Sequence, residues 1–199
     1  MFLVFEGLDG SGSTTQAKLL AEKLRALGKK VIHTSEPTDN AAGKLIRDAL
    51  QGKWKISPEG LQLLFCADRA HHLEQEILPA LNSDNIVICD RYIWSTLAYG
   101  SLNTDSKWLQ ELNKHFLKPD FTFLLQVPPK ICLERIHKRG LPNELFEEEQ
   151  KLKKVWETYE ELVIFEKNSI ALDGERKEEE ILDEALAILR KKFPDEFSG

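Results

Sequence analysis

Cysteine is scarce in this 199-residue chain, and long apolar runs are missing from it. The three cysteines (Cys66, Cys89 and Cys132) are odd in number, far apart and without C-x-x-C spacing, which argues against a disulfide framework and against a zinc site. No stretch reaches the roughly 20 apolar residues that span a bilayer, and no basic segment leading into an apolar run resembles a secretion signal. We therefore expect a cytoplasmic protein with no membrane segment.

The chain also lacks an excess of basic residues. Its 27 Lys and Arg face 33 Asp and Glu, which gives a formal net charge of -6, whereas a protein that coats nucleic acid needs a basic surface to neutralise phosphates. We expect no nucleic-acid partner. Internal repeats and low-complexity linkers are missing too, and 42% hydrophobic residues suffice for a substantial core, so residues 1–199 are expected to form a single domain.

The most informative stretch that is present lies at the start of the chain. An apolar run over Phe2–Phe5 predicts a strand, and the spacing of apolar residues over Thr14–Ala26 predicts a helix. Between them the sequence matches the phosphate-binding pattern G-x-x-x-x-G-K-[ST], except that Ser13 stands in place of the lysine. Such a loop lets the backbone approach phosphates at the positive end of a helix. The alternative is an ordinary Gly-Ser turn. The predicted ATP-binding residues are Gly7, Leu8, Asp9, Gly10, Ser11, Gly12, Ser13, Thr14 and Thr15.

Four more apolar runs predict strands, and helical patterns separate them. The strands are expected at Lys30–Thr34, Asn85–Cys89, Phe121–Val127 and Ser169–Leu172. Helices are expected through Ile46 and Leu50, from Ser57 to about His72, and over Glu74–Leu81, Asp105–Phe116, Pro129–Lys138, Glu144–Glu166 and Glu178–Lys192. This alternation predicts an α/β fold, a five-stranded parallel sheet with helices on both faces.

Polar residues gather where the predicted strands end. In an open parallel sheet, ligands bind at the carboxyl ends of the strands, and the segments 6–14, 35–40 and 90–95 all fall there. Asp90 directly follows a buried strand, as expected of a carboxylate that holds Mg²⁺ together with Thr14. Arg91 suits a phosphate clamp. A surface ion pair at a strand end is the alternative.

A second group of polar residues lies on the predicted helix that starts near Ser57. Phe65 and Arg69 are four apart, so they share one face of the helix and could stack on a base and bond to it. Alternatively, Phe65 packs in the core and Arg69 lies outside. His71 and His72, near Glu74 and Glu76, could suggest a metal, but a polar helix face is the preferred interpretation.

Taken together, six segments in order along the chain resemble the thymidylate kinase family: FEGLDGSGSTTQ (5–16), TSEPT (34–38), GKLIR (43–47), LLFCADR (63–69), DRYIWSTLAY (90–99) and PDFTFLLQVPP (119–129). The resemblance covers most of the chain. It implies a P-loop NTPase fold with a small lid at about residues 135–148. It also implies Mg²⁺-dependent transfer of phosphate from ATP to dTMP, giving dTDP and ADP, in a homodimer.

The same resemblance implies roles for individual residues. Asp9 would lie at the deoxyribose 3′-OH and the catalytic centre, and Arg47 and Arg91 would bind the dTMP phosphate. Phe65 would stack on thymine, and Arg69 would form a hydrogen bond with an oxygen of the base. Tyr92 would crowd the 2′ position of the sugar. The acceptor residues are Asp9, Glu36, Arg47, Phe65, Arg69, Arg91, Tyr92, Ser95, Thr96 and Tyr99; the catalytic residues are Asp9, Arg91, Arg135 and Arg139; the metal ligands are Thr14 and Asp90.

Two departures from the family pattern bear on function. Ser13 removes the lysine that reaches the β- and γ-phosphates, and we hypothesise that Arg135, Lys138 or Arg139 of the lid, with Arg91, supplies that charge. Gly100 follows Tyr99 where a glutamine is usual. Two alternative functions stay open: a nucleotide-binding homologue that has lost transfer, and a kinase for another nucleoside monophosphate.

Overall fold

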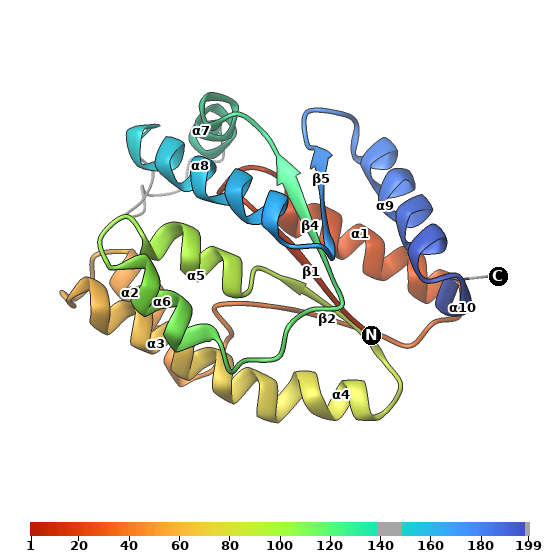
Figure 1. Cartoon of the computed structure of the whole chain (residues 1–199), viewed down its shortest axis with the longest axis horizontal. Helices are drawn as coiled ribbons and strands as arrows, with labels where there is room; N and C mark the ends of the chain where they lie inside the picture. Colours follow the sequence, from red (N-terminus) through yellow and green to blue (C-terminus); the bar gives the residue numbers. More distant parts are fainter. Residues whose placement is uncertain (139–148, 198–199) are drawn as a thin grey trace.

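The computed structural model describes residues 1–138 and 149–197, and its centre is a five-stranded sheet (Figure 1). The strands are β1 (Phe2–Gly7), β2 (Val31–Ser35), β3 (Ile86–Asp90), β4 (Phe121–Gln126) and β5 (Ser169–Asp173). Their order is β2-β3-β1-β4-β5, and every neighbouring pair is parallel. The predicted α/β fold with a five-stranded parallel sheet is therefore confirmed.

Strand β1 lies in the middle of the sheet because its residues are buried on both sides. Leu3 and Phe5 belong to one core cluster, while Phe2 and Val4 belong to another, and all four are at most 1% exposed. Successive side chains of a strand point to opposite faces, so an unbroken apolar run is what a strand covered on both faces requires.

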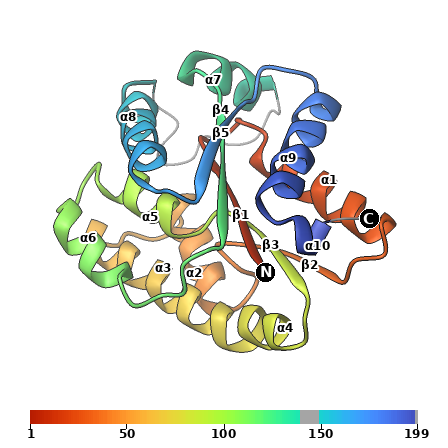
Figure 2. The same ribbon diagram turned by 45° about the vertical axis from the view of Figure 1, so that its right-hand side comes forward.

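Helices cover both faces of the sheet (Figure 2). One face carries α1 (Ser13–Ala26), α9 (Glu178–Lys192) and α10 (Pro194–Phe197), which share a core cluster with β1 and its neighbours. The other face carries α2 (Ala41–Leu50), α3 (Pro58–His72), the π-helical turn η1 (Leu73–Ile77), α4 (Leu78–Asn82), α5 (Ile93–Gly100), α6 (Ser106–Asn113) and α8 (Glu149–Phe165). Helix α7 (Pro129–Lys138) follows β4 and packs against α8.

Most helix boundaries agree with the sequence patterns. The hydroxyl of Ser57 accepts a hydrogen bond from the Gly60 N–H at 3.0 Å, so this residue caps α3 as predicted. The separate helices α5 and α10 were not predicted. Only residues 135–138 of the predicted lid are described, as the end of α7; Arg139 and residues 144–148 of the long predicted helix lie outside the described residues. Among the helices of the described ranges, none is both long and apolar enough to cross a membrane.

Candidate functional site

The loop after β1 separates two cavities at the carboxyl end of the sheet. The first, of about 120 Å³, is lined by Asp9 and Arg91 and is called the Arg91 cavity here. The second, of about 300 Å³, is lined by Gly10, Arg135 and Gly174 and is called the Arg135 cavity. Adjacent residues of this loop, Asp9 and Gly10, therefore line different cavities.

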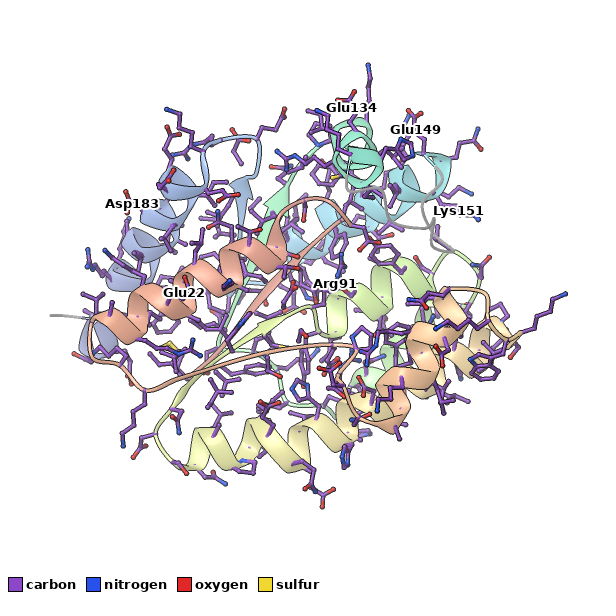
Figure 3. The ribbon with its side chains drawn as sticks, turned by 180° about the vertical axis from the view of Figure 1, so that it is seen from behind. Glu22, Arg91, Glu134, Glu149, Lys151 and Asp183 are labelled. Atoms are coloured by element: carbon purple, nitrogen blue, oxygen red, sulfur yellow. The ribbon has the colours of Figure 1, made fainter. Side chains whose placement is uncertain are left out.

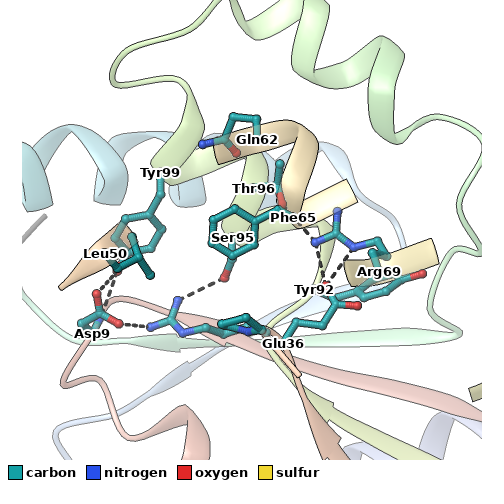
Figure 4. Close-up of a pocket in the computed structure, with 12 residues that line it drawn as sticks. Asp9, Glu36, Leu50, Gln62, Phe65, Arg69, Tyr92, Ser95, Thr96 and Tyr99 are labelled. Carbon is teal, nitrogen blue, oxygen red and sulfur yellow. Dashed lines mark hydrogen bonds and ion pairs between the residues drawn. The ribbon is translucent and has the colours of Figure 1, made fainter. Parts of the chain in front are cut away.

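Nine of the ten predicted acceptor residues line the Arg91 cavity (Figure 4): Asp9, Glu36, Phe65, Arg69, Arg91, Tyr92, Ser95, Thr96 and Tyr99. Arg47 is not among the described residues that line it. Its guanidinium instead donates to the carbonyl oxygens of Pro37 and Thr38, at 3.0 and 2.7 Å, and pairs with Asp39 at 3.0 Å. The structure therefore gathers residues that lie up to 90 positions apart in the sequence.

Asp9 and Arg91 form an ion pair in the wall of the Arg91 cavity. One terminal nitrogen of Arg91 lies 2.5 Å from Oδ1 of Asp9, while the hydroxyl of Tyr99 donates to Oδ2 at 3.1 Å and accepts from the Asp9 N–H at 2.9 Å. Burial alone would lower the pKa of Arg91, but Asp9, together with Tyr99, Tyr159 and Asp90, outweighs it, and the pKa lies well above its ordinary value. The Arg91 guanidinium is thus fixed and charged.

The backbone holds Arg91 in an unusual conformation. Its φ is 68°, in the left-handed region that side chains other than glycine rarely adopt. The Arg91 N–H donates to the carbonyl of Phe5 at 2.8 Å, and its guanidinium donates to the carbonyl of Gly7 at 3.0 Å and to the hydroxyl of Ser95 at 3.1 Å. Seen from behind in Figure 3, Arg91 lies in the middle of the molecule, whereas Glu134 and Asp183 lie at its edge.

Helix α5 is capped by a carboxylate from another element. Oε1 of the buried Glu6 in β1 accepts from the N–H groups of Tyr92 and Ser95, at 2.9 and 3.2 Å. Oε2 accepts from the hydroxyls of Ser95 and Tyr159, at 2.6 and 3.1 Å. Burial raises the pKa of Glu6, and these hydrogen bonds oppose that shift only in part. The sequence placed Glu6 near the end of an apolar strand but did not identify it as a cap, because its partners Ser95 and Tyr159 are distant in the sequence.

Arg69 lies inside the protein, so the interpretation that places it outside is wrong. Its side chain is 1% exposed and pairs with Oε2 of Glu36 at 2.8 Å. It also donates to Thr96 at 3.0 Å and to the side-chain oxygen of Asn113. The rings of Tyr92 and Phe116 lie against the guanidinium, with centroids 4.9 and 5.6 Å from its carbon.

His72 extends this cluster, although the sequence placed it on a polar helix face. It is buried, with Nδ1 3.1 Å from Oε1 of Glu36 and Nε2 2.7 Å from the hydroxyl of Thr34. Together with Asn113, His72 is a residue that sequence reasoning did not place in the site. Within residues 1–138 and 149–197, no group of three or more His, Cys, Asp and Glu is arranged to hold a metal ion.

Tyr92 contributes a buried ring to the Arg91 cavity. The residue is 1% exposed, and its ring packs edge-on against Phe2, with centroids 5.1 Å apart. Burial raises the pKa of its hydroxyl, which is buried and has no hydrogen-bond partner in the described part of the chain. The ring thus serves as a support beneath Arg69.

The loop between the two cavities has the conformation expected of a phosphate cradle. Gly10 has a φ of 86°, and a Cβ on it would lie 2.6 Å from the carbonyl oxygen of Cys132, so only glycine fits there. The loop ends at Gly12, in a left-handed conformation, from which α1 begins. Helix α1 thus directs its first N–H groups toward the loop. Leu8 is fully buried in the core, while Ser11, Gly12 and Thr15 line the Arg135 cavity.

Arg135 spans the outer side of this loop. Its guanidinium donates to the carbonyl oxygens of Gly10 and Ser11, at 3.3 and 3.2 Å, and to that of Gly174 at 3.1 Å. Ser13, in the lysine position, is buried. The partners of Arg135 within the described ranges are neutral carbonyl groups, so its positive charge stays available beside the loop.

Thr14 and Asp90 meet at the start of α1. The hydroxyl of Thr14 donates to Oδ2 of Asp90 at 2.5 Å, and Oδ1 of Asp90 is buried with no hydrogen-bond partner in the described chain. A hydroxyl and a carboxylate with an unused oxygen are ligands that suit Mg²⁺. The two residues therefore fit a divalent cation.

Comparison with known proteins gives one consistent result. A family model described as thymidylate kinase matches residues 5–185. The thymidylate kinase of Leptospira interrogans (serogroup Icterohaemorrhagiae serovar copenhageni) is 41% identical over 191 residues, which cover 94% of this chain and 93% of that protein. The probable thymidylate kinase of Pyrococcus horikoshii is 49% identical over 146 residues (70% and 71%), and that of Methanocaldococcus jannaschii is 40% identical over 192 residues (96% of each).

Proposed function

Because the chain belongs to the thymidylate kinase family, we propose that it transfers the γ-phosphoryl group of ATP to dTMP and forms dTDP and ADP. The observation that carries this proposal is the phosphate loop with one cavity on each side of it. Two substrates on the two sides of one loop can bring their phosphates together. Phosphoryl transfer requires this positioning and charge neutralisation rather than a covalent nucleophile.

We assign dTMP to the Arg91 cavity. Phe65 would stack on the base, and Arg69, which can only donate hydrogen bonds, would bond a base carbonyl oxygen. Arg91 would hold the dTMP phosphate, and Asp9, which pairs with Arg91, would contact the sugar. The proposed contact of Arg47 with the phosphate and the proposed crowding of the 2′ position by Tyr92 complete this assignment.

We assign ATP to the loop Gly7–Thr15, with its base toward the Arg135 cavity. An oxygen of the dTMP phosphate would attack the γ-phosphorus, and the bond from that phosphorus to the β–γ bridging oxygen would break to release ADP. The backbone N–H groups of the loop and the start of α1 would hold the phosphates. Arg135, with Lys138 and Arg139, would supply the positive charge that Ser13 does not.

We propose that Thr14 and Asp90 hold Mg²⁺ between the loop and β3. The unused Oδ1 of Asp90 supports this proposal. The ion would neutralise charge on the β- and γ-phosphates during transfer.

The proposal is tested by measuring ADP release and product formation with Mg-ATP and each of dTMP, dUMP, dCMP, dGMP and UMP. We expect the highest kcat/KM with dTMP, and dTDP as the product identified by chromatography. ADP release that dTMP does not accelerate would refute transfer. A higher kcat/KM with another acceptor would refute the assignment of dTMP.

We also propose that the chain forms a homodimer in the cytoplasm. Half-exposed Leu45 and Leu63 lie on the adjacent helices α2 and α3, and a second copy could cover them. Light scattering coupled to size-exclusion chromatography should give twice the mass of 22.8 kDa; a mass of one chain would refute the dimer.

A further inference from the structure

We propose that Gln62 reads the base of the acceptor nucleotide, by pairing its carboxamide with the N3–H and an adjacent carbonyl of a pyrimidine-2,4-dione ring. The proposal deepens the proposed function and rests on the assignment of dTMP to the Arg91 cavity. Gln62 has no counterpart among the residues that the sequence resemblance assigned to the site.

The first observation is an unused hydrogen-bonding group beside the cavity. Gln62 on α3 lines the Arg91 cavity, is 4% exposed, and has a buried Oε1 without a hydrogen-bond partner in the described part of the chain. In Figure 4 its carboxamide lies at the edge of the drawn pocket, above Thr96 and Phe65. Buried polar atoms without partners are uncommon and destabilising, so a ligand that supplies the missing donor would explain why an amide is present here.

The second observation is the space that the carboxamide occupies. A Cβ on Gly100 would lie 3.0 Å from both Cδ and Oε1 of Gln62, and 2.9 Å from Cδ1 of Leu109. Because Gly100 has no side chain, space is left beside it, and Gln62 extends into this space from α3. This places an amide beside Thr96, on the same helix as Gly100, and beside the ring of Phe65 on its own helix.

The chemistry of the neighbouring groups selects the base edge that fits. An amide offers both an acceptor and donors, so it can pair with an N–H and C=O that are adjacent in a ring. Turned over, it could equally pair with the N3 and amino group of cytosine. With Arg69 at position 4 of the ring, Gln62 faces N3 and position 2 instead. A guanidinium only donates, so position 4 must carry the carbonyl oxygen of thymine or uracil rather than the amino group of cytosine. Gln62 and Arg69 together favour thymine and uracil over cytosine.

The test compares Gln62→Met, which keeps the length of the side chain but loses the amide, with Gln75→Met as a control at an exposed position of η1. The acceptors are dTMP, dUMP and N3-methyl-dTMP, in which the N–H is replaced. In Gln62→Met we expect kcat/KM to fall about tenfold for dTMP and equally for dUMP. We expect little change for N3-methyl-dTMP, and the KM for ATP and the control variant should be unchanged.

The preference for dTMP over N3-methyl-dTMP decides the matter, because a purely structural loss would lower both rates alike. If Gln62→Met keeps the wild-type preference, or leaves the KM for dTMP within twofold of wild type, Gln62 does not read the base. Should N3-methyl-dTMP react in neither protein, the KM for dTMP alone decides: a rise of fivefold or more supports the proposal and a smaller one overturns it. Absence of dTDP with the wild-type protein would instead refute the proposed function.

Discussion

Replacing Glu36 by glutamine should both destabilise the protein and weaken its acceptor site. Glu36 is the counter-charge of Arg69, whose side chain is 1% exposed, and it also bonds His72. Removing one partner of a buried ion pair usually costs about 3–5 kcal/mol, and because glutamine keeps one acceptor oxygen we expect about 3 kcal/mol. For a chain of this length, each kcal/mol lowers Tm by about 2–4 °C. We therefore expect Tm to fall by about 6–12 °C.

The same change should raise the KM for dTMP about tenfold, because Arg69 loses the group that orients it toward the base. Calorimetry measures the fall in Tm, and steady-state kinetics measures the rise in the KM for dTMP. The KM for ATP should stay unchanged. Glu111→Gln is the matched control: Glu111 pairs with Lys114 on the surface, where such pairs contribute about 1 kcal/mol or less. A Tm within 2 °C of wild type, with an unchanged KM for dTMP, would refute this account of the Arg69 cluster.

Three further predictions concern the cap, the metal and the loop. Burial raises the pKa of Glu6 in the folded state, so protonation of Glu6 favours folding. This stabilising contribution is complete below about pH 4.3, the ordinary pKa of a glutamate, and is lost as the pH rises from there through the raised pKa. The free energy of unfolding of Glu6→Gln, measured by urea denaturation, should therefore rise relative to that of wild type as the pH goes from 4 to 8. A difference between the two proteins that stays constant over this range would contradict the prediction. Asp90→Asn should raise the Mg²⁺ concentration for half-maximal activity at least about tenfold, with the KM for dTMP unchanged; an unaltered Mg²⁺ titration would argue against the site. Arg135→Met should lower kcat about 100-fold, the effect of removing one preorganised donor, and adding Ser13→Lys should restore part of it; a kcat within threefold of wild type would remove Arg135 from the mechanism.

The sheet and the loop could be predicted because their signals are local. Apolar runs such as Phe2–Phe5 and Phe121–Val127 are continuous in sequence, and such a run is by itself the signal of a strand that is buried on both faces. The glycine spacing from Gly7 to Gly12 likewise lies within a few residues of backbone. The strands and the loop depend on residues that are neighbours in the chain, so both can be predicted from the sequence alone.

The buried polar network could not be predicted because its partners are distant in sequence. Glu6 contacts Ser95, 89 positions away, and His72 contacts Glu36, 36 positions away. Arg69 was a candidate for the surface because a buried guanidinium is stable only with partners, and its partner Asn113 is 44 positions away. Helix α5 was missed for the same reason, since its cap comes from Glu6 in β1.

Glu6 and Gly7 are consecutive residues of β1, and they serve the two sides of the site. Glu6 holds the start of α5, which carries Ser95 and Tyr99, whereas Gly7 begins the loop proposed for the phosphates of ATP. The offset between these two attachment points is therefore set by covalent geometry, with about 3.8 Å between adjacent Cα atoms. Strand β1 is also paired on both sides, with β3 and β4. A movement of the surrounding helices therefore leaves the spacing between the two attachment points unchanged.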